Sequence, residues 1–276
     1  MIMMMRGCRG TMPVSGSQFN RFGGKTTCLT IHNGASCLII DAGTGIAGIM
    51  HEMAEKSELP AITLLFTHFH LDHVAGLPSF EMLYNRDADI TIMADAQRHW
   101  PWRDTLMGIM SKPLWPVELG DLPARMRLSD LPASGQGIKT DGIFIRWMRV
   151  PHPQQSLAYS FEAEGFKLVL ATDAEFRAGH QQTEFIRFCE GADCLIMDAH
   201  YRPDEYPAFR GWGHSSFEAA AEAANMAGVG RLVLTHHAPT RTDDEVLQIE
   251  QETRQLFPNT TAGYEGMLLN KNPESE

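Results

Sequence analysis

Four side chains that can bind metal ions lie between positions 68 and 73, in the pattern HxHxDH. The apolar segment Ile62–Thr67 precedes them and has the composition of a buried strand. Because side chains alternate along a strand, His68 and His70 should point to the same side. The chain is then expected to turn into a helix, whose first turn directs Asp72 and His73 towards a second point nearby. The cluster therefore predicts two adjacent cations rather than one.

Three more candidate ligands follow apolar segments elsewhere in the chain. They are His152, Asp173 and His236, and each comes just after a predicted strand. Because strand ends meet at one edge of a sheet, these side chains are expected to converge on the cluster. Histidine and aspartate without cysteine favour Zn²⁺, with Mn²⁺ or Fe²⁺ as alternatives.

This constellation resembles the metallo-β-lactamase superfamily of binuclear metallohydrolases, over about Gly7 to Met267. The pattern is most similar to the ribonuclease Z and phosphodiesterase-like branch, whose glycine-rich opening matches Gly23 to Cys28 and whose Asp-x-Gly turn matches Asp41 to Gly43. The resemblance implies two divalent metal ions with Asp173 as the bridging ligand. It assigns one ion to His68, His70 and His152, and the other to Asp72, His73 and His236.

Two further motifs match that branch. Gly213-His214-Ser215-Ser216 resembles its Gly-His-Ser-Thr motif, and Asp198 stands where ribonuclease Z has the glutamate of His-Glu-Ala-Thr. The resemblance implies that Asp198 orients His214 as a proton donor. Asp72 is expected both to bind a cation and either to accept the proton of the attacking water or to orient that water.

Six residues near these motifs have open assignments. Asp41 is expected either to orient a ligand histidine or to close its own turn. His237 is a less favoured alternative ligand to His236, and is expected to support the site or to face substrate. His200 is a candidate pocket residue. Trp212 could reach a substrate phosphate, as could Arg202 and Arg210, or all three could belong to a solvated loop.

The implied fold is α/β, a four-layer αββα sandwich of two mixed β-sheets flanked by helices. Asn33-Gly34 predicts a hairpin turn. A short helix is predicted up to Glu52, and residues 71–84 have helical spacing interrupted by Pro78. The sequence also predicts strands at Ile143–Val150 and Phe166–Ala171 and a short helix around Thr183–Cys189. Ser215 with Glu218, and Thr242 with Glu245, predict two capped helices, the first closed by Gly228. We expect one domain over 1–276, with a Pro- and Trp-rich insert at about 99–132 that lacks regular structure. Its tryptophans either pack the insert down or stack on a base, and they are Trp100, Trp102 and Trp115.

Composition narrows the classes of partner. The 276 residues carry 34 acidic and 23 basic side chains, a formal charge of −11, which disfavours binding of extended nucleic acid. The five cysteines form no CxxC pair, so a disulfide framework is not expected. No apolar run is long enough for a membrane span. These features predict a cytoplasmic protein, and the resemblance implies a homodimer.

The expected activity is hydrolysis of a small phosphodiester, a cyclic nucleotide or a short oligonucleotide, by hydroxide generated at the metal centre. Residues 153–172 read as two strands and leave no room there for the tRNA-binding arm of ribonuclease Z. The alternatives are a lactone, acyl-ester or thioester hydrolase, and a ribonuclease Z-like RNA endonuclease. A redox protein with iron in the same site is a further, less favoured class.

Overall fold

The computed structural model describes residues 1–49, 59–96, 101–133, 136–180 and 182–270. The helix expected to run on to Glu52 therefore lies partly outside the described residues, as do the start of the insert and Trp100. Among the described helices, none combines the length and the apolar character that crossing a membrane requires.

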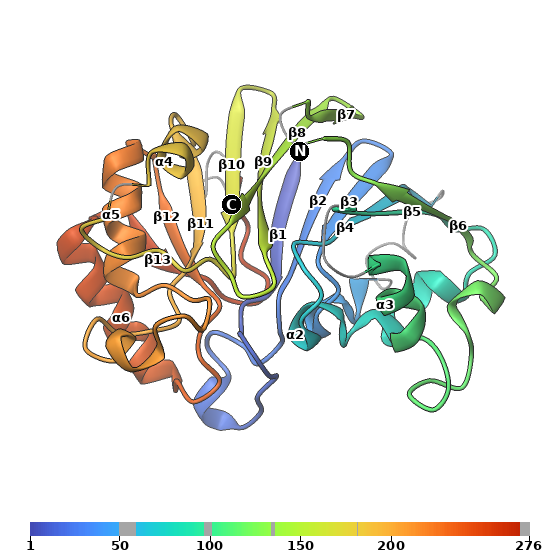
Figure 1. Cartoon of the computed structure of the whole chain (residues 1–276), viewed down its shortest axis with the longest axis horizontal. Coiled ribbons are helices and arrows are strands. Elements are labelled where there is room, and N and C mark those ends of the chain that lie inside the picture. The colour runs from blue at the N-terminus through green and yellow to red at the C-terminus, as the bar shows by residue number, and fades with distance from the viewer. Residues whose placement is uncertain (50–58, 97–100, 134–135, 181, 271–276) are drawn as a thin grey trace.

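Two mixed β-sheets face each other (Figure 1). The first has the order β1-β2-β3-β4-β5-β6 and is built from Ile2–Gly7, Cys28–Asn33, Ser36–Ile40, Ala61–Leu65, Asp89–Ala94 and Arg125–Asp130. The second has the order β13-β12-β11-β10-β9-β8-β7. In chain order its strands, β7 to β13, are Ile138–Thr140, Ile143–Val150, Ser156–Ala163, Phe166–Ala171, Cys194–Asp198, Leu232–Thr235 and Thr260–Ala262.

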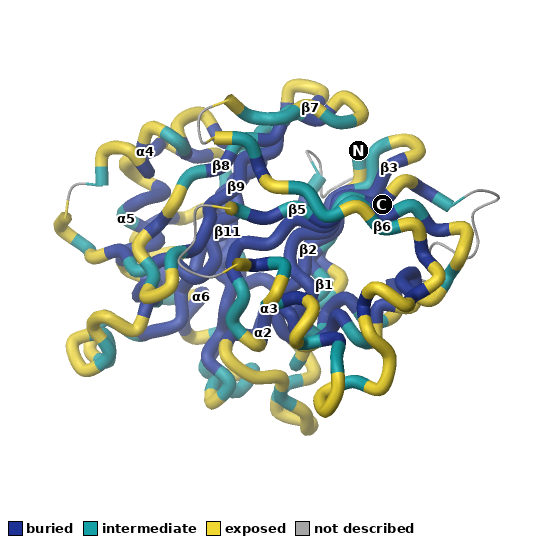
Figure 2. Tube along the Cα trace, turned by 45° about the vertical axis from the view of Figure 1, so that its right-hand side comes forward, coloured by how far each residue is buried: buried dark blue, intermediate teal, exposed yellow. Residues whose placement is uncertain are grey.

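Alternating side chains divide the core into three apolar layers. In β3, Leu38 and Ile40 pack between the sheets, whereas Cys37 and Ile39 face the outer helices. Strands β10 and β11 alternate in the same way between the central layer and the helices on the other side. Strands that are apolar on both faces must be covered on both faces. Figure 2 shows the resulting continuous buried interior beneath exposed loops.

Helices cover the outer face of each sheet, which confirms the expected four-layer arrangement. The first sheet is covered by α2 (Leu71–Val74), α3 (Trp102–Ile109) and the 3₁₀ turns η2 to η5, which are Thr44–Ile46, Leu77–Ser79, Glu81–Tyr84 and Leu119–Asp121. The second is covered by α4 (Thr183–Cys189), α5 (Phe217–Ala227) and α6 (Asp243–Leu256). Short 3₁₀ turns also occur at η1 (Ser17–Phe19) and η6 (Tyr206–Phe209).

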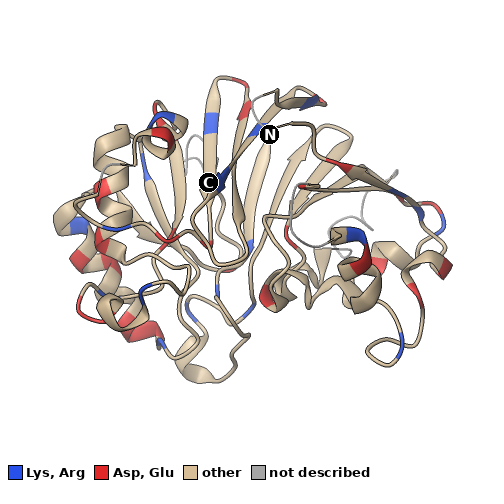
Figure 3. Ribbon diagram, in the orientation of Figure 1, with Lys and Arg blue, Asp and Glu red and all other residues tan. Residues whose placement is uncertain are grey.

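Acidic residues are prominent on α5 and α6, as Figure 3 shows. The first turn of α6 begins with three of them, Asp243 to Glu245, where the positive end of the helix dipole favours negative charge. The capping box of Thr242 and Glu245 is present as predicted. Gly228 closes α5 in the left-handed conformation, also as predicted.

The structure corrects three local predictions. The helix predicted over residues 71–84 is a single turn, α2, followed by η3 and η4. The N-cap of α5 is Ser216, whose hydroxyl accepts a hydrogen bond from the Ala219 amide, and not Ser215. The insert at 99–132 does contain regular structure, because α3 and the edge strand β6 lie within it.

Candidate metal centre

The loop after β4 delivers the first group of predicted ligands. His68 and His73 are completely buried, Asp72 is 5% exposed, and His70 is half-buried. Asp72 and His73 belong to the single turn of α2, which begins directly after His70. The strand-to-helix transition inferred from the sequence is confirmed, although the helix is shorter.

The other predicted ligands come from the second sheet. His152 follows β8, Asp173 follows β10 and His236 follows β12, all at the same edge of that sheet. Asp173 and His236 have left-handed backbones, with φ of 51° and 59°. This conformation is uncommon for residues other than glycine and often marks functional sites. It turns the chain sharply where each strand ends.

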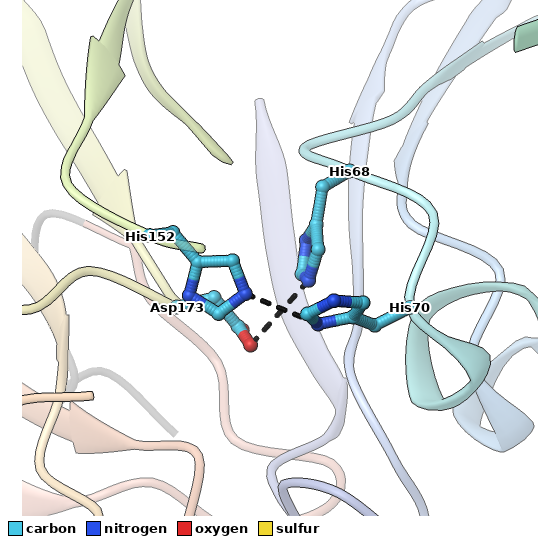
Figure 4. Close-up of side chains that lie close together, drawn as sticks. All are labelled: His68, His70, His152 and Asp173. Atoms are coloured by element: carbon cyan, nitrogen blue, oxygen red, sulfur yellow. Dashed lines mark hydrogen bonds and ion pairs between the residues drawn. The ribbon is translucent and has the colours of Figure 1, made fainter. Parts of the chain in front are cut away.

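One cluster contains His68, His70, His152 and Asp173, which Figure 4 shows pointing towards a common centre. Their candidate ligand atoms all lie within 4.8 Å of one another. His152 Nε2 is 3.1 Å from His70 Nδ1, and His68 Nε2 is 3.6 Å from Asp173 Oδ1. These are the four residues that the resemblance grouped around one ion.

A second cluster contains Asp72, His73, Asp173 and His236. His73 Nε2 lies 3.0 Å from Asp173 Oδ2 and 3.4 Å from Asp72 Oδ2. His236 Nε2 lies 3.2 Å and 3.1 Å from the same two oxygens. Asp173 is the residue common to both clusters, with Oδ1 towards the first and Oδ2 towards the second.

These separations fit divalent cations. Two ligand atoms at ~2.0–2.1 Å from a tetrahedral Zn²⁺ are ~3.3–3.4 Å apart, close to the separations above. The Nε2 atoms of His68 and His73 are buried and form no hydrogen bond within the described part of the chain. Buried polar atoms normally have partners, and cations bound at the two clusters would supply them.

The opposite ring nitrogens are held by neighbouring groups. His73 Nδ1 donates to Asp41 Oδ2 at 2.7 Å, and His152 Nδ1 donates to the Gly213 carbonyl at 2.9 Å. Asp41 also accepts hydrogen bonds from the amide and hydroxyl of Thr67. Of the two roles predicted for Asp41, the structure therefore supports the orientation of a ligand histidine. Such contacts fix which nitrogen faces a metal.

Electrostatics keep both carboxylates ionised. Burial pushes the pKa of Asp72 upwards, but His73 and His236 outweigh it and hold that pKa below its usual range. Burial likewise raises the pKa of Asp173, and His236, His73 and His68 more than offset it. Burial lowers the pKa of His152 to about 4, which keeps its imidazole neutral and able to bind a cation.

His214 and Asp198 form the predicted pair beside the clusters. His214 Nδ1 lies 2.8 Å from Asp198 Oδ2, and Asp198 Oδ1 accepts hydrogen bonds from the amides of His200 and Ser215. Burial lowers the pKa of His214, but Asp198 more than compensates and the pKa rises to about 9. The His214 ring stacks on that of His236, with centroids 4.7 Å apart.

A cavity of about 540 Å³ opens over the two ligand clusters and the His214–Asp198 pair. Asp72, Asp173, His214 and His236 line it, as does the loop 238–241. His200 also lines it, as predicted for a pocket residue. A reacting group in this cavity would therefore meet both clusters and the His214–Asp198 pair.

Comparison with known families agrees with this geometry. The model of the family described as "Beta-lactamase superfamily domain" matches residues 37–237, which contain all seven predicted ligands. The chain belongs to the metallo-β-lactamase superfamily.

The individual relatives of this protein have low sequence identity to it. A ribonuclease Z from Agathobacter rectalis is 26% identical over 308 aligned positions, covering 93% of each protein. The metallo-β-lactamase fold protein YhfI from Bacillus subtilis superposes with a TM-score of 0.72 at 18% identity, covering 98% of this chain and 99% of that one. Zn²⁺-bound PqqB from Methylobacterium extorquens gives 0.72 at 16% identity, covering 98% and 100%.

Three of the remaining candidate residues do not line the cavity. His237 does not line the cavity; its Nε2 donates to the Gly263 carbonyl and its ring packs edge-on against Phe22. Arg202 forms a double hydrogen bond with Glu252, and Arg210 is exposed outside the cavity lining. Trp212, by contrast, does line the cavity.

The two described tryptophans of the insert pack it down, one of the two predicted roles. Trp102 is 2% exposed and donates to Asp130, and Trp115 donates to the Tyr84 hydroxyl. Neither lines the cavity.

Two groups at the site were missed from the sequence. The Thr11 amide donates to Asp72 Oδ2 at 2.7 Å, and a backbone amide leaves no residue-type signal. Glu175, two positions after Asp173, accepts hydrogen bonds from the amides of Gly211 and Gly213. Its proximity to a predicted ligand was the one available hint.

Proposed function

We propose that this protein hydrolyses phosphodiester bonds at a centre that holds two divalent cations. The observation that carries the proposal is Asp173, which belongs to two ligand clusters at once. The His214–Asp198 pair beside those clusters, in the same cavity, supports a reaction that releases an alkoxide, because that leaving group needs a proton. The full-length relatives named ribonuclease Z favour a phosphodiester over an acyl ester as the bond that is cleaved.

The proposed ligands are those grouped above. His68, His70 and His152 would hold one cation, Asp72, His73 and His236 the other, with Asp173 between them. A pair of cations in such a site generates hydroxide at neutral pH and polarises a phosphoryl oxygen. The nitrogen and carboxylate ligands support Zn²⁺, and Mn²⁺ is the alternative for testing.

The side chains of this protein have distinct tasks in that reaction. Asp72 keeps one oxygen bonded to the Thr11 amide, which fixes the orientation of its carboxylate. Asp198 holds the His214 ring through Nδ1 and raises the pKa of His214 to about 9, which favours a proton on the other ring nitrogen. His214 would then protonate the departing oxygen.

Two kinds of phosphodiester are candidates. The relatives that align over most of both chains are named ribonuclease Z, and this supports RNA more strongly than the small diester expected from the sequence. The formal charge of −11 favours a small diester, as does the β9–β10 hairpin that occupies residues 153–172. Both candidates share the same bond and the same proposed machinery.

The test is hydrolysis of bis(p-nitrophenyl) phosphate by protein loaded with Zn²⁺ or Mn²⁺. We expect turnover that requires metal and disappears in Asp72→Ala. The control is Asp204→Ala, since the Asp204 side chain is 82% exposed. Absence of turnover in protein that contains two metals per chain would reject the proposal and direct the search to lactones and thioesters.

The substrate class follows from a second assay. A 3′-extended structured RNA, a short single-stranded RNA and a 3′,5′-cyclic nucleotide are compared by kcat/KM. A preference for the structured RNA would support the ribonuclease reading, and a preference for the cyclic nucleotide would support the small diester.

A further inference from the structure

An aromatic wall forms one side of the cavity over the clusters. It consists of Tyr201, Phe209 and Trp212, all of which line the cavity. Tyr201 and Phe209 stack nearly parallel, with centroids 4.9 Å apart and planes 3° apart. Trp212 meets Phe209 edge-on at 5.5 Å. The wall therefore runs from a buried base, where Tyr201 is 6% exposed, to a rim at Trp212, which is 64% exposed.

Glu175 holds this wall in place. Its carboxylate accepts hydrogen bonds from the amides of Gly211 and Gly213, on either side of Trp212, and from the Tyr206 hydroxyl. Glu175 lies two residues beyond Asp173, so the loop that carries Trp212 is bonded to the same segment of chain that provides a proposed metal ligand. A pre-ordered aromatic contact loses little conformational entropy when a ligand binds.

Two guanidinium groups near this wall already have partners. Arg241 lines the cavity but pairs with Glu205, and Arg202 pairs with Glu252. These guanidinium groups are therefore not free to follow a phosphate backbone. The indole of Trp212 remains as a large exposed contact at the rim, and aromatic side chains that line a cavity beside a few polar groups are typical of ligand-binding pockets.

We propose that Trp212 is the specificity-determining residue of this site, and that it stacks on a planar aromatic group, a nucleobase or an aryl ring, attached to the reacting phosphate. The inference rests on the proposed function and adds a substrate class to it. Stacking of a base on an aromatic side chain corresponds to a change of roughly tenfold or more in affinity. A single base beside the reacting phosphate would be recognised in a small nucleotide and in RNA alike.

The experiment measures binding of reaction products, so it does not depend on turnover. Dissociation constants are determined by calorimetry with metal-loaded protein for two matched pairs. Adenosine 5′-monophosphate is compared with ribose 5-phosphate, which lacks the base, and phenyl phosphate is compared with methyl phosphate. We expect the aromatic member of each pair to bind at least about tenfold more tightly.

The variants assign that preference to one residue. Trp212→Ala should bring the ratio in both pairs close to one, while Trp212→Phe keeps most of it. Trp115→Phe is the matched control, because Trp115 lies outside the cavity, and it should retain the full ratio. Since Trp212 is exposed, both of its variants should fold, which circular dichroism checks.

Each outcome decides the inference. No aromatic preference in the wild type, or a preference that survives in Trp212→Ala, would overturn it. A gain for adenosine 5′-monophosphate alone would identify a nucleobase as the ligand, and equal gains in both pairs would identify any planar ring. Aromatic preference in a protein that does not hydrolyse phosphodiesters would instead overturn the proposed function, so the two failures are distinguishable.

Discussion

His73 donates a hydrogen bond from Nδ1 to Oδ2 of Asp41 at 2.7 Å. Asp41 sits at the end of β3 with a left-handed φ of 60°, and the Thr67 amide and hydroxyl also donate to its carboxylate. The turn after one strand thereby orients a proposed ligand that comes after the neighbouring strand. Both groups are completely buried, so water cannot replace either partner.

Asp41→Asn should lower metal affinity by about 10–100-fold, because the amide loses the charged acceptor that holds the ring of His73. Asparagine tolerates the left-handed backbone, so the turn itself should survive. Competition with a chelator of known affinity measures the change. Asp204→Asn is the control, and an affinity for metal equal to that of the wild type in Asp41→Asn would refute the orienting role.

His214→Ala should reduce kcat for phosphodiesters by about 10²–10⁴ while both cations remain bound. The loss should be greatest for alkyl leaving groups, which need a proton, and smallest for p-nitrophenolate. Steady-state rates for the two diester types, with metal content determined on the same samples, test this. His180→Ala serves as an exposed histidine control. Equal losses for both leaving groups would show that His214 does not supply the proton.

Gly213→Ala and Gly211→Ala form a matched pair. Both glycines have positive φ, 95° and 90°, so alanine is similarly strained at either position. A Cβ at position 213 would lie 2.2 Å from His152 Nδ1, whereas a Cβ at 211 meets nothing within 4 Å. Metal analysis should therefore find fewer cations per chain in Gly213→Ala only. Full occupancy in both variants would contradict the assigned role of His152.

The elements with strong local patterns were predictable from the sequence. Strands Ile143–Val150 and Phe166–Ala171, and helix Thr183–Cys189, have the expected boundaries because apolar alternation and flanking turns define them. The helix after His70 was predicted too long. Its single turn ends where Gly76 packs against the backbone of Gly43, a contact between distant segments that no local pattern encodes.

The candidate site shows the same difference between features that local sequence encodes and features that depend on how distant segments pack. The seven proposed ligands were predictable because each is a polar residue just after an apolar strand. The contacts that orient them were harder to foresee, since several use backbone groups. The carbonyl of Gly213 and the amide of Thr11 are examples, and their positions depend on how distant loops pack. Ser215 shows the same limit, because its hydroxyl bonds to Ala174 and Phe176 and does not cap α5.

Arg9→Ala should lower the free energy of unfolding by about 2–5 kcal/mol, because buried carbonyl groups lose their donor. Arg9 is completely buried, and its guanidinium donates to the carbonyls of Gly23 and Arg241. Urea unfolding measures the change, with the exposed Arg21→Ala as control. Identical unfolding midpoints and slopes for the two variants would show that this buried network contributes nothing.

The proposed ligands divide between the two halves of the sandwich. His68, His70, Asp72 and His73 belong to the half built on the first sheet, and the remaining three belong to the half built on the second. Cations bound between them would act as a cross-link that holds the halves together. Because such ions bind the folded chain in preference to the unfolded one, metal supply would set resistance to heat as well as catalytic rate. Chelation would then loosen the sandwich along the seam between its sheets, and metal-starved protein would be more exposed to proteolysis.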